Sequence, residues 1–119
     1  MKCKTIQIDC KDLRERDLHK AFKDKLGFPD FYGMNWDALI DCLSNLREPT
    51  YGMTTVALEN DKVLLINCND LHSAKFDIDV FLDVIEAVNA RGLAWFDKPF
   101  VFLCPIDPEL SAREKNRID

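Results

Sequence analysis

The sequence lacks the features of a membrane-spanning, secreted or disulfide-bonded protein. No apolar run approaches the roughly 18 residues of a membrane-spanning helix, and the opening residues, Met1-Lys2-Cys3-Lys4, do not form the apolar core of a secretion signal. The five cysteines are scattered and none stands in a C-x-x-C pair, so neither a disulfide framework nor a zinc site is indicated. We therefore expect a cytoplasmic protein with reduced thiols and no cofactor.

The motifs of common enzyme classes are missing as well. There are only four glycines, no glycine-rich phosphate loop and no G-x-S-x-G motif around a nucleophilic serine. His19 lies among lysines on a predicted helix and is expected to be solvated. His72 stands four residues after Cys68 and would bind a metal ion only with two further ligands. We expect no catalytic residues.

Positive charge is scarce over most of the chain. The net charge is −5, but residues 1–26 carry eight Lys or Arg against five Asp or Glu, whereas residues 27–119 carry eight against sixteen. Between Phe28 and Leu46 there are three aspartates and no Lys or Arg. A negative surface repels nucleic acid and attracts basic proteins. We expect a basic protein partner and no binding to nucleic acid or membranes.

Hydrophobic periodicity predicts an α/β fold. The 119 residues suit one domain, with a core at residues 1–104 and a C-terminal extension at residues 105–119. The unbroken run Val63-Leu64-Leu65-Ile66 suits the centre of a helix-covered parallel sheet. Right-handed crossovers then give a small three-stranded parallel sheet packed with helices. Strands are predicted at residues 3–9, 62–67 and 100–104, with an extra short strand at residues 54–58.

Three helices connect these strands. The predicted helices cover residues 13–26, 36–46 and 78–91. Gly27 and Gly92 are expected to end the first and the third of them. Pro105 is expected to stop the last strand, and Asp107-Pro108-Glu109 has the composition of the start of a C-terminal helix.

The helix predicted at residues 36–46 is amphipathic, and Asn35 is a good N-cap for it. At about 100° per residue, one arc collects the apolar side chains of Trp36, Leu39, Ile40, Leu43 and Leu46. The opposite side carries Asp37, Asp41, Ser44 and Asn45. We interpret this segment as a half-buried helix with a carboxylate-bearing outer face.

Asp37 and Asp41 are neighbours on that face, where two like charges cost a helix about 0.2–0.5 kcal/mol. The helix dipole favours Asp37 in the first turn but explains Asp41 less well. On spacing alone, an ordinary solvated face and a binding surface both remain open. The turn Phe28-Pro29-Asp30-Phe31-Tyr32-Gly33 directly before the helix favours a protein-binding hot spot, with Phe28 anchoring the turn to the core.

The sequence contains two further acidic arrangements. A hydrolase could hold Mg²⁺ between Asp37 and Asp41, although no third carboxylate stands at an obvious ligand spacing. Asp79, Asp83 and Glu86 lie along one side of the helix predicted at residues 78–91. This second row is a solvated face unless both helices flank one groove, where the two rows would form a joint negative field.

The segment Phe31-Tyr32-Gly33-Met34-Asn35-Trp36-Asp37-Ala38-Leu39-Ile40-Asp41-Cys42-Leu43 closely resembles the barstar family, the intracellular inhibitors of barnase-type ribonucleases. The likeness extends back through Leu26-Gly27-Phe28-Pro29 and on, more weakly, to residues 100–104, so that it covers most of residues 1–104. The resemblance implies the fold of that family, a three-stranded parallel sheet with helices on it.

The resemblance also implies a role for single residues. Asp37 and Asp41 match the acidic residues that enter the ribonuclease active site, where they meet the basic groups that normally hold RNA phosphate. The other matching contact positions are Phe31, Gly33, Asn35 and Ser44. The implied mechanism is occlusion by carboxylates that mimic phosphates, without catalysis.

Several positions depart from the family pattern. Phe31 lacks the hydroxyl of the usual tyrosine, Ile40 replaces a tryptophan, and the segment at residues 47–61 is longer. Ala87 stands where the compact inhibitors carry an acidic residue, so Asp83 and Glu86 are the candidates for a secondary partner contact. The leading hypothesis is a ribonuclease inhibitor, monomeric when free, and the alternative is a barstar-like adaptor for another basic protein.

Overall fold

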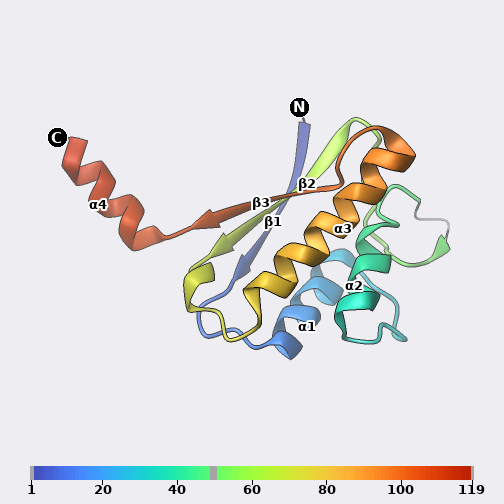
Figure 1. Ribbon diagram of the computed structural model, residues 1–119, viewed down its shortest axis with the longest axis horizontal. Coiled ribbons are helices and arrows are strands. Elements are labelled where there is room, and N and C mark those ends of the chain that lie inside the picture. The colour runs from blue at the N-terminus through green and yellow to red at the C-terminus, as the bar shows by residue number, and fades with distance from the viewer. Residues whose placement is uncertain (1, 49–50, 119) are drawn as a thin grey trace.

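A three-stranded parallel sheet forms one layer of the protein, as seen in the computed structural model, which describes residues 2–48 and 51–118 (Figure 1). The strands β1 (Lys2–Asp9), β2 (Lys62–Asn69) and β3 (Val101–Ile106) lie in the order β1-β2-β3. Ile66 in β2 stands opposite Ile6 on one side and Leu103 on the other. The predicted α/β class and three-stranded parallel sheet are confirmed, with the continuous apolar run in the central strand.

The helices α1 (Glu15–Leu26), α2 (Trp36–Leu43) and α3 (Ile78–Phe96) gather on one side of the sheet, whereas α4 (Pro108–Ile118) extends away from it at the end of β3 (Figure 1). A short 3-10 helix, η2 (Leu71–Ser73), follows β2. The core between sheet and helices contains, among others, Ile8, Phe22, Leu43, Ile66, Phe81 and Phe100. Among the described residues, no helix has the length and apolar character needed to cross a membrane.

The extra strand predicted at residues 54–58 does not form, and that prediction was wrong. Its backbone N–H groups bond to the end of α1 and to the turns after α2 instead of to a sheet. Thr55 N–H donates to the carbonyls of Leu26 and Gly27 at 3.2 and 3.1 Å, and Leu58 N–H donates to Leu46 O at 2.7 Å. The carbonyls at a helix end have no partner inside the helix, and this segment supplies donors to those at the end of α1.

Two predicted ends of elements were also wrong. The helix α3 continues through Gly92 to Phe96, and Asp97 ends it in the left-handed conformation with a φ of 59°. Gly92 is needed for close packing, because a Cβ there would lie 2.5 Å from the carbonyl oxygen of Lys98. The strand β3 continues through Pro105 to Ile106, since an edge strand tolerates a residue that has no N–H.

The second face of the sheet is only partly covered. Thr5, Leu65 and Phe102 form one row across β1, β2 and β3. Thr5 is exposed, Leu65 is partly exposed, and 41% of the surface of Phe102 is accessible. The expectation of a fully helix-covered sheet is therefore correct for one face only, and it is this covered face that supports the acidic helix.

Candidate protein-binding site

The aromatic turn before α2 is anchored to the core at two points. Phe28 and Tyr32 are buried, with 5% and 6% of their surfaces accessible, and their ring centres lie 4.9 Å apart. Phe31 between them points outward and is 76% exposed. The predicted anchor, Phe28, is confirmed, and Tyr32 is a second one. The turn therefore holds Phe31 at the surface from a fixed base.

His19 is part of this base, and the prediction of a solvated side chain was wrong. Its ring is fully buried, and Nδ1 lies 2.6 Å from the hydroxyl oxygen of Tyr32. Nε2 lies 3.3 Å from a carboxylate oxygen of Glu15. A carboxylate only accepts hydrogen bonds, so Nε2–H donates to Glu15 and Nδ1 accepts from the Tyr32 hydroxyl. Burial lowers the pKa of His19, although the hydrogen bond to Glu15 acts in the opposite direction.

Asn35 fixes the start of α2 as predicted. Its Oδ1 accepts a hydrogen bond from Ala38 N–H at 2.8 Å, and its Nδ2 donates to Gly33 O at 3.3 Å. Met34 takes a left-handed conformation, with a φ of 55°, and turns the chain into the extended backbone of Asn35. A Cβ at Gly33 would lie 2.8 Å from Asn35 Nδ2. Gly33 and Asn35 therefore act together to position the first turn of α2.

The two faces of α2 separate as the periodicity predicts. Leu39, Cys42 and Leu43 are buried against the core. Asp37 and Asp41 are exposed on the outer face, with 60% of the Asp41 side chain accessible. Among the described residues, no Lys, Arg or His is within salt-bridge distance of Asp37. The outer face therefore presents the carboxylate of Asp37 at the helix start, without a salt-bridge partner among the described residues, and the carboxylate of Asp41 one turn later.

Asp41 is paired with Arg91 of α3, a partner that sequence reasoning missed. Arg91 Nη1 lies 3.0 Å from Asp41 Oδ1 and 3.3 Å from Ser44 Oγ. The Arg91 side chain is 38% exposed and the Asp41 side chain is 60% exposed. Because both are exposed to solvent, this ion pair contributes at most about 1 kcal/mol to stability. No local spacing rule links residues so far apart in the sequence, and only the packing of α2 on α3 brings them together.

Ser44 does not share the exposure of the two aspartates. Only 2% of its surface is accessible. Its hydroxyl donates to Ile40 O at 2.6 Å and accepts from Arg91. The expectation that Ser44 lies on the outer side of the helix with the aspartates was wrong, because α3 packs against this end of α2 and Arg91 contacts the Ser44 hydroxyl. Ser44 helps to hold Arg91 beside Asp41.

The second acidic row lies on another part of α3. Arg91 points toward α2. At about 100° per residue, Glu86 lies roughly 140° around the helix axis from Arg91, and Asp83 lies roughly 80° from Arg91. Asp83 and Glu86 line a shallow hollow with Ala87 and Ala90. The side of α3 that meets the acidic helix therefore carries a cation, and the two acidic rows are not joined by any hydrogen bond or salt bridge among the described residues.

A second arginine, Arg47, lies in the turns after α2 and contacts the end of α3. Only 7% of its surface is accessible, and Nη2 donates to the carbonyls of Lys62 and Pro99 at 2.7 and 2.8 Å. Its guanidinium carbon lies 5.4 and 4.6 Å from the ring centres of Phe96 and Phe100. Burial lowers the pKa of Arg47. Arg47 therefore links the turns after α2 to β2 and to the end of α3.

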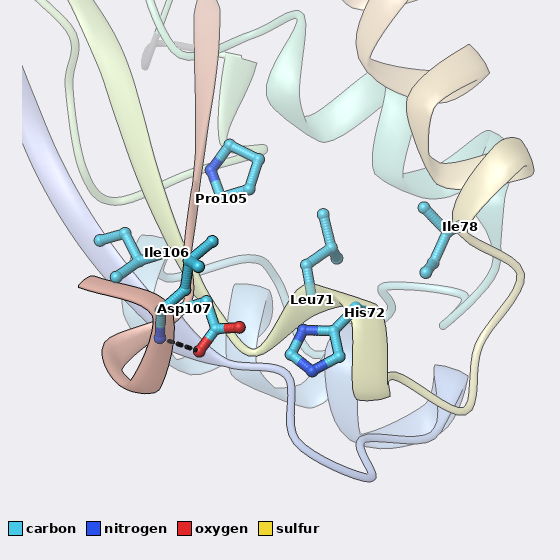
Figure 2. A pocket seen from close by; sticks show the side chains of 7 residues that line it. Leu71, His72, Ile78, Pro105, Ile106 and Asp107 are labelled. Atoms are coloured by element: carbon cyan, nitrogen blue, oxygen red, sulfur yellow. Dashed lines mark hydrogen bonds between the residues drawn. The ribbon is translucent and has the colours of Figure 1, made fainter. Parts of the chain in front are cut away.

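A larger apolar hollow lies elsewhere, between η2, the start of α3 and the C-terminal extension. Figure 2 shows Leu71, His72, Ile78 and Pro105 around it, and its volume is about 420 Å³. It shares no lining residue with the acidic face of α2. Across the part of the chain that the structure describes, no group of three His, Cys, Asp or Glu side chains is arranged to hold a metal ion.

These features define a small α/β domain that presents carboxylates from a capped and firmly supported helix. The chain belongs to the barstar family: the model of that family, described as Barstar (barnase inhibitor), matches residues 3–104. It is also similar to a Bacillus subtilis (strain 168) protein named "Putative ribonuclease inhibitor YrdF", with 55% identity over 40 residues. That match covers 33% of this chain and 44% of the relative, so it spans less than half of either protein.

Proposed function

We propose that this protein inhibits a basic ribonuclease by occluding its active site with the outer face of α2. The observation that carries the proposal is the exposure of Asp37 and Asp41 on a helix whose underside is buried. A ribonuclease binds RNA phosphate with cationic side chains, and two fixed carboxylates offer these cations the same kind of partner. Membership of the barstar family supports the proposal.

The support behind α2 favours binding with little rearrangement. Asn35 caps the helix, the Phe28–Tyr32 pair anchors the preceding turn, and Leu43 packs in the core. A surface that is already in its bound conformation loses less conformational entropy on association. Complementary charge raises the association rate further. All five cysteines are free thiols, which suits the cytoplasm as the proposed site of action.

The test is to titrate barnase-type ribonucleases with the protein and follow the cleavage of a fluorogenic RNA. Asp41→Ala removes a carboxylate from the centre of the proposed contact and should weaken inhibition by about 30-fold or more, as expected for a hot-spot residue. Glu114→Ala is the matched control, because it removes one exposed carboxylate from α4, which lies away from the acidic helix (Figure 1). The control should inhibit like the unvaried protein.

Failure of the unvaried protein to inhibit any nuclease of this type would refute the proposal. Equal inhibition by Asp41→Ala and Glu114→Ala would move the binding surface away from α2. The thermal unfolding of both variants, followed by circular dichroism, shows whether a loss of inhibition comes from the surface or from the fold.

Arg91 favours one alternative, a barstar-like adaptor that binds another basic protein. The cation of Arg91 beside Asp41 weakens the negative potential at the centre of the acidic face. Ala87 adds no carboxylate to this face. Affinity capture with the unvaried protein, with the Asp41→Ala variant as the background, separates the two functions. Enrichment of a small basic nuclease supports inhibition, and consistent enrichment of a basic protein without nuclease activity supports the adaptor.

A further inference from the structure

A cleft of about 380 Å³ continues the acidic face of α2 beyond Asp41. Its walls are formed by the turns that follow α2, by Tyr51 and by the last turn of α3. The lining residues are Ser44, Asn45, Glu48, Tyr51, Trp95 and Phe96. Ser44, which lines the cleft, also contacts Arg91, the partner of Asp41, so the cleft and the acidic face are adjacent.

Hydrogen-bond acceptors follow one stripe from α2 into this cleft. Asp37, Asp41, Asn45 and Glu48 are spaced by four, four and three residues, which keeps them on one side of a helical backbone. The turns after Leu43 preserve this direction, because Asn45 N–H donates to Cys42 O and Glu48 N–H donates to Asn45 O. Asn45 Nδ2 donates to Asp41 O at 2.7 Å, and within residues 2–48 and 51–118 no donor is bonded to the Asn45 amide oxygen.

Two aromatic rings form the opposite part of the cleft and are largely uncovered. Tyr51 is 71% exposed and Trp95 is 58% exposed. Large aromatic side chains in such positions are typical of protein contacts, where they supply much of the binding energy. Their faces also attract cations, and the guanidinium carbon of Arg91 already lies 5.8 Å from the centre of the Trp95 ring.

We propose that this cleft receives an arginine or lysine side chain of the same basic target, so that the binding surface extends from Asp37 to Trp95. This inference rests on the proposed function. The aliphatic stem of the entering side chain packs between Tyr51 and Trp95, and its charged head meets the Glu48 carboxylate and the Asn45 amide oxygen. Glu48 and Tyr51 belong to the segment at residues 47–61, which is longer than in the compact inhibitors, so the cleft gives this chain a means of selecting its own target.

The first experiment needs no nuclease. Acetyl-arginine amide is titrated into the isotope-labelled protein, and the indole N–H signals of Trp95 and Trp36 are followed by NMR. Acetyl-citrulline amide, which has nearly the same shape without the charge, is the control ligand. We expect a saturable shift at Trp95 with the arginine compound, little shift at Trp36, and a response to citrulline at least about threefold weaker, because charge adds to the attraction by an aromatic face and a carboxylate.

The second experiment measures binding to an inhibited barnase-type ribonuclease. Trp95→Ala should weaken affinity about tenfold or more, and Glu48→Gln should weaken it about threefold. Leu93→Ala is the control, since Leu93 is 55% exposed on the same helix but does not line the cleft. It should bind like the unvaried protein, and all three variants should keep the unfolding midpoint.

The outcomes separate this inference from the proposed function. If no nuclease is bound but arginine amide shifts the Trp95 signal, the proposed function fails and the cation-binding cleft stands. If the nuclease is bound and Trp95→Ala behaves like Leu93→Ala, the inhibitor function stands and the cleft inference is wrong. Equal responses of Trp95 to arginine and citrulline amides would also overturn the inference.

Discussion

The two faces of α2 are held by different interactions. The underside, with Leu39, Cys42 and Leu43, is buried in the core. The outer face carries Asp37 and Asp41, and the described residues give it one cross-helix ion pair, to Arg91. Because buried apolar contacts supply most of the stability and exposed ion pairs supply little, the outer face is free to change with the target while the underside is not. The predictions below test this separation.

The largest effect is expected on the underside of the helix. Leu43→Ala should lower the free energy of unfolding by about 2–5 kcal/mol, because the substitution removes apolar contacts and leaves a cavity in the core. Equilibrium unfolding in urea measures the loss. Asp37→Ala on the outer face provides the comparison and should change the midpoint little. A Leu43→Ala variant as stable as Asp37→Ala would remove the distinction between the faces.

The next largest effect concerns the buried arginine. Arg47→Ala should cost about 2–3 kcal/mol, because two partly buried carbonyls lose their donor and the Phe96 and Phe100 rings lose the guanidinium beside them. The same substitution at Arg91 should cost less than about 1 kcal/mol, since that ion pair is exposed. Urea unfolding of both variants checks the order. Similar losses at the two positions would contradict the argument from burial.

A smaller and pH-dependent effect is expected from His19. Its pKa in the folded protein lies below the ordinary 6.5, so the unfolded chain takes up a proton first as the pH falls. The contribution of the neutral ring to stability is complete above about pH 6.5 and decreases as the pH drops below it, by up to about 1.4 kcal/mol per pH unit. His19→Gln should flatten the pH dependence of the unfolding free energy between pH 7.5 and 5.5.

Two groups that face His19 determine the control for this measurement. Glu15 favours the charged ring, whereas Tyr32 supplies the hydroxyl that bonds to the neutral ring. Tyr32→Phe removes that hydroxyl and should cost about 1 kcal/mol near pH 7 while the pH dependence remains. An unchanged pH dependence in His19→Gln would show that other groups cause the acid destabilisation.

The smallest effect on stability is expected at Arg91, where a change in binding should be visible instead. Arg91→Gln should lower the unfolding free energy by less than about 1 kcal/mol. Removing a cation from the centre of the acidic face should raise the association rate with a basic nuclease about twofold to threefold at low salt. Arg91→Lys keeps the charge and should associate at the original rate. Stopped-flow fluorescence measures both, and a slower Arg91→Gln would show that holding Asp41 in place matters more than charge.

The fold could be predicted from the sequence where local patterns act directly. The apolar run of β2, the N-cap Asn35 and the apolar arc of α2 each indicate one structure. The prediction of an extra strand at residues 54–58 was wrong because that segment bonds to the end of α1 and to the turns after α2, which no local pattern shows. Gly92 does not end α3: glycine is common both at helix ends and where another segment packs closely, here at Lys98, and the local sequence does not distinguish the two.

The candidate site could be predicted only in part for a related reason. Asp37, Asp41 and Asn35 lie on one helix, where spacing determines which residues share a face. Arg91, Trp95 and Tyr51 reach the same surface from distant segments, and only tertiary packing brings them to the end of α2. The burial of His19 has a sequence signal, because its place between Leu18 and Phe22 on α1 is compatible with a buried face.

The central claim is that the charges on the outer face of α2 serve binding and not folding. The double variant Asp37→Asn/Asp41→Asn tests it most directly, because it keeps the shape of both side chains and removes only their charge. Its affinity for an inhibited ribonuclease and its unfolding free energy are measured under one condition. We predict an affinity at least about 100-fold lower with a change in unfolding free energy below about 1 kcal/mol. An unchanged affinity, or a loss of affinity that only follows a loss of folding, would contradict the account.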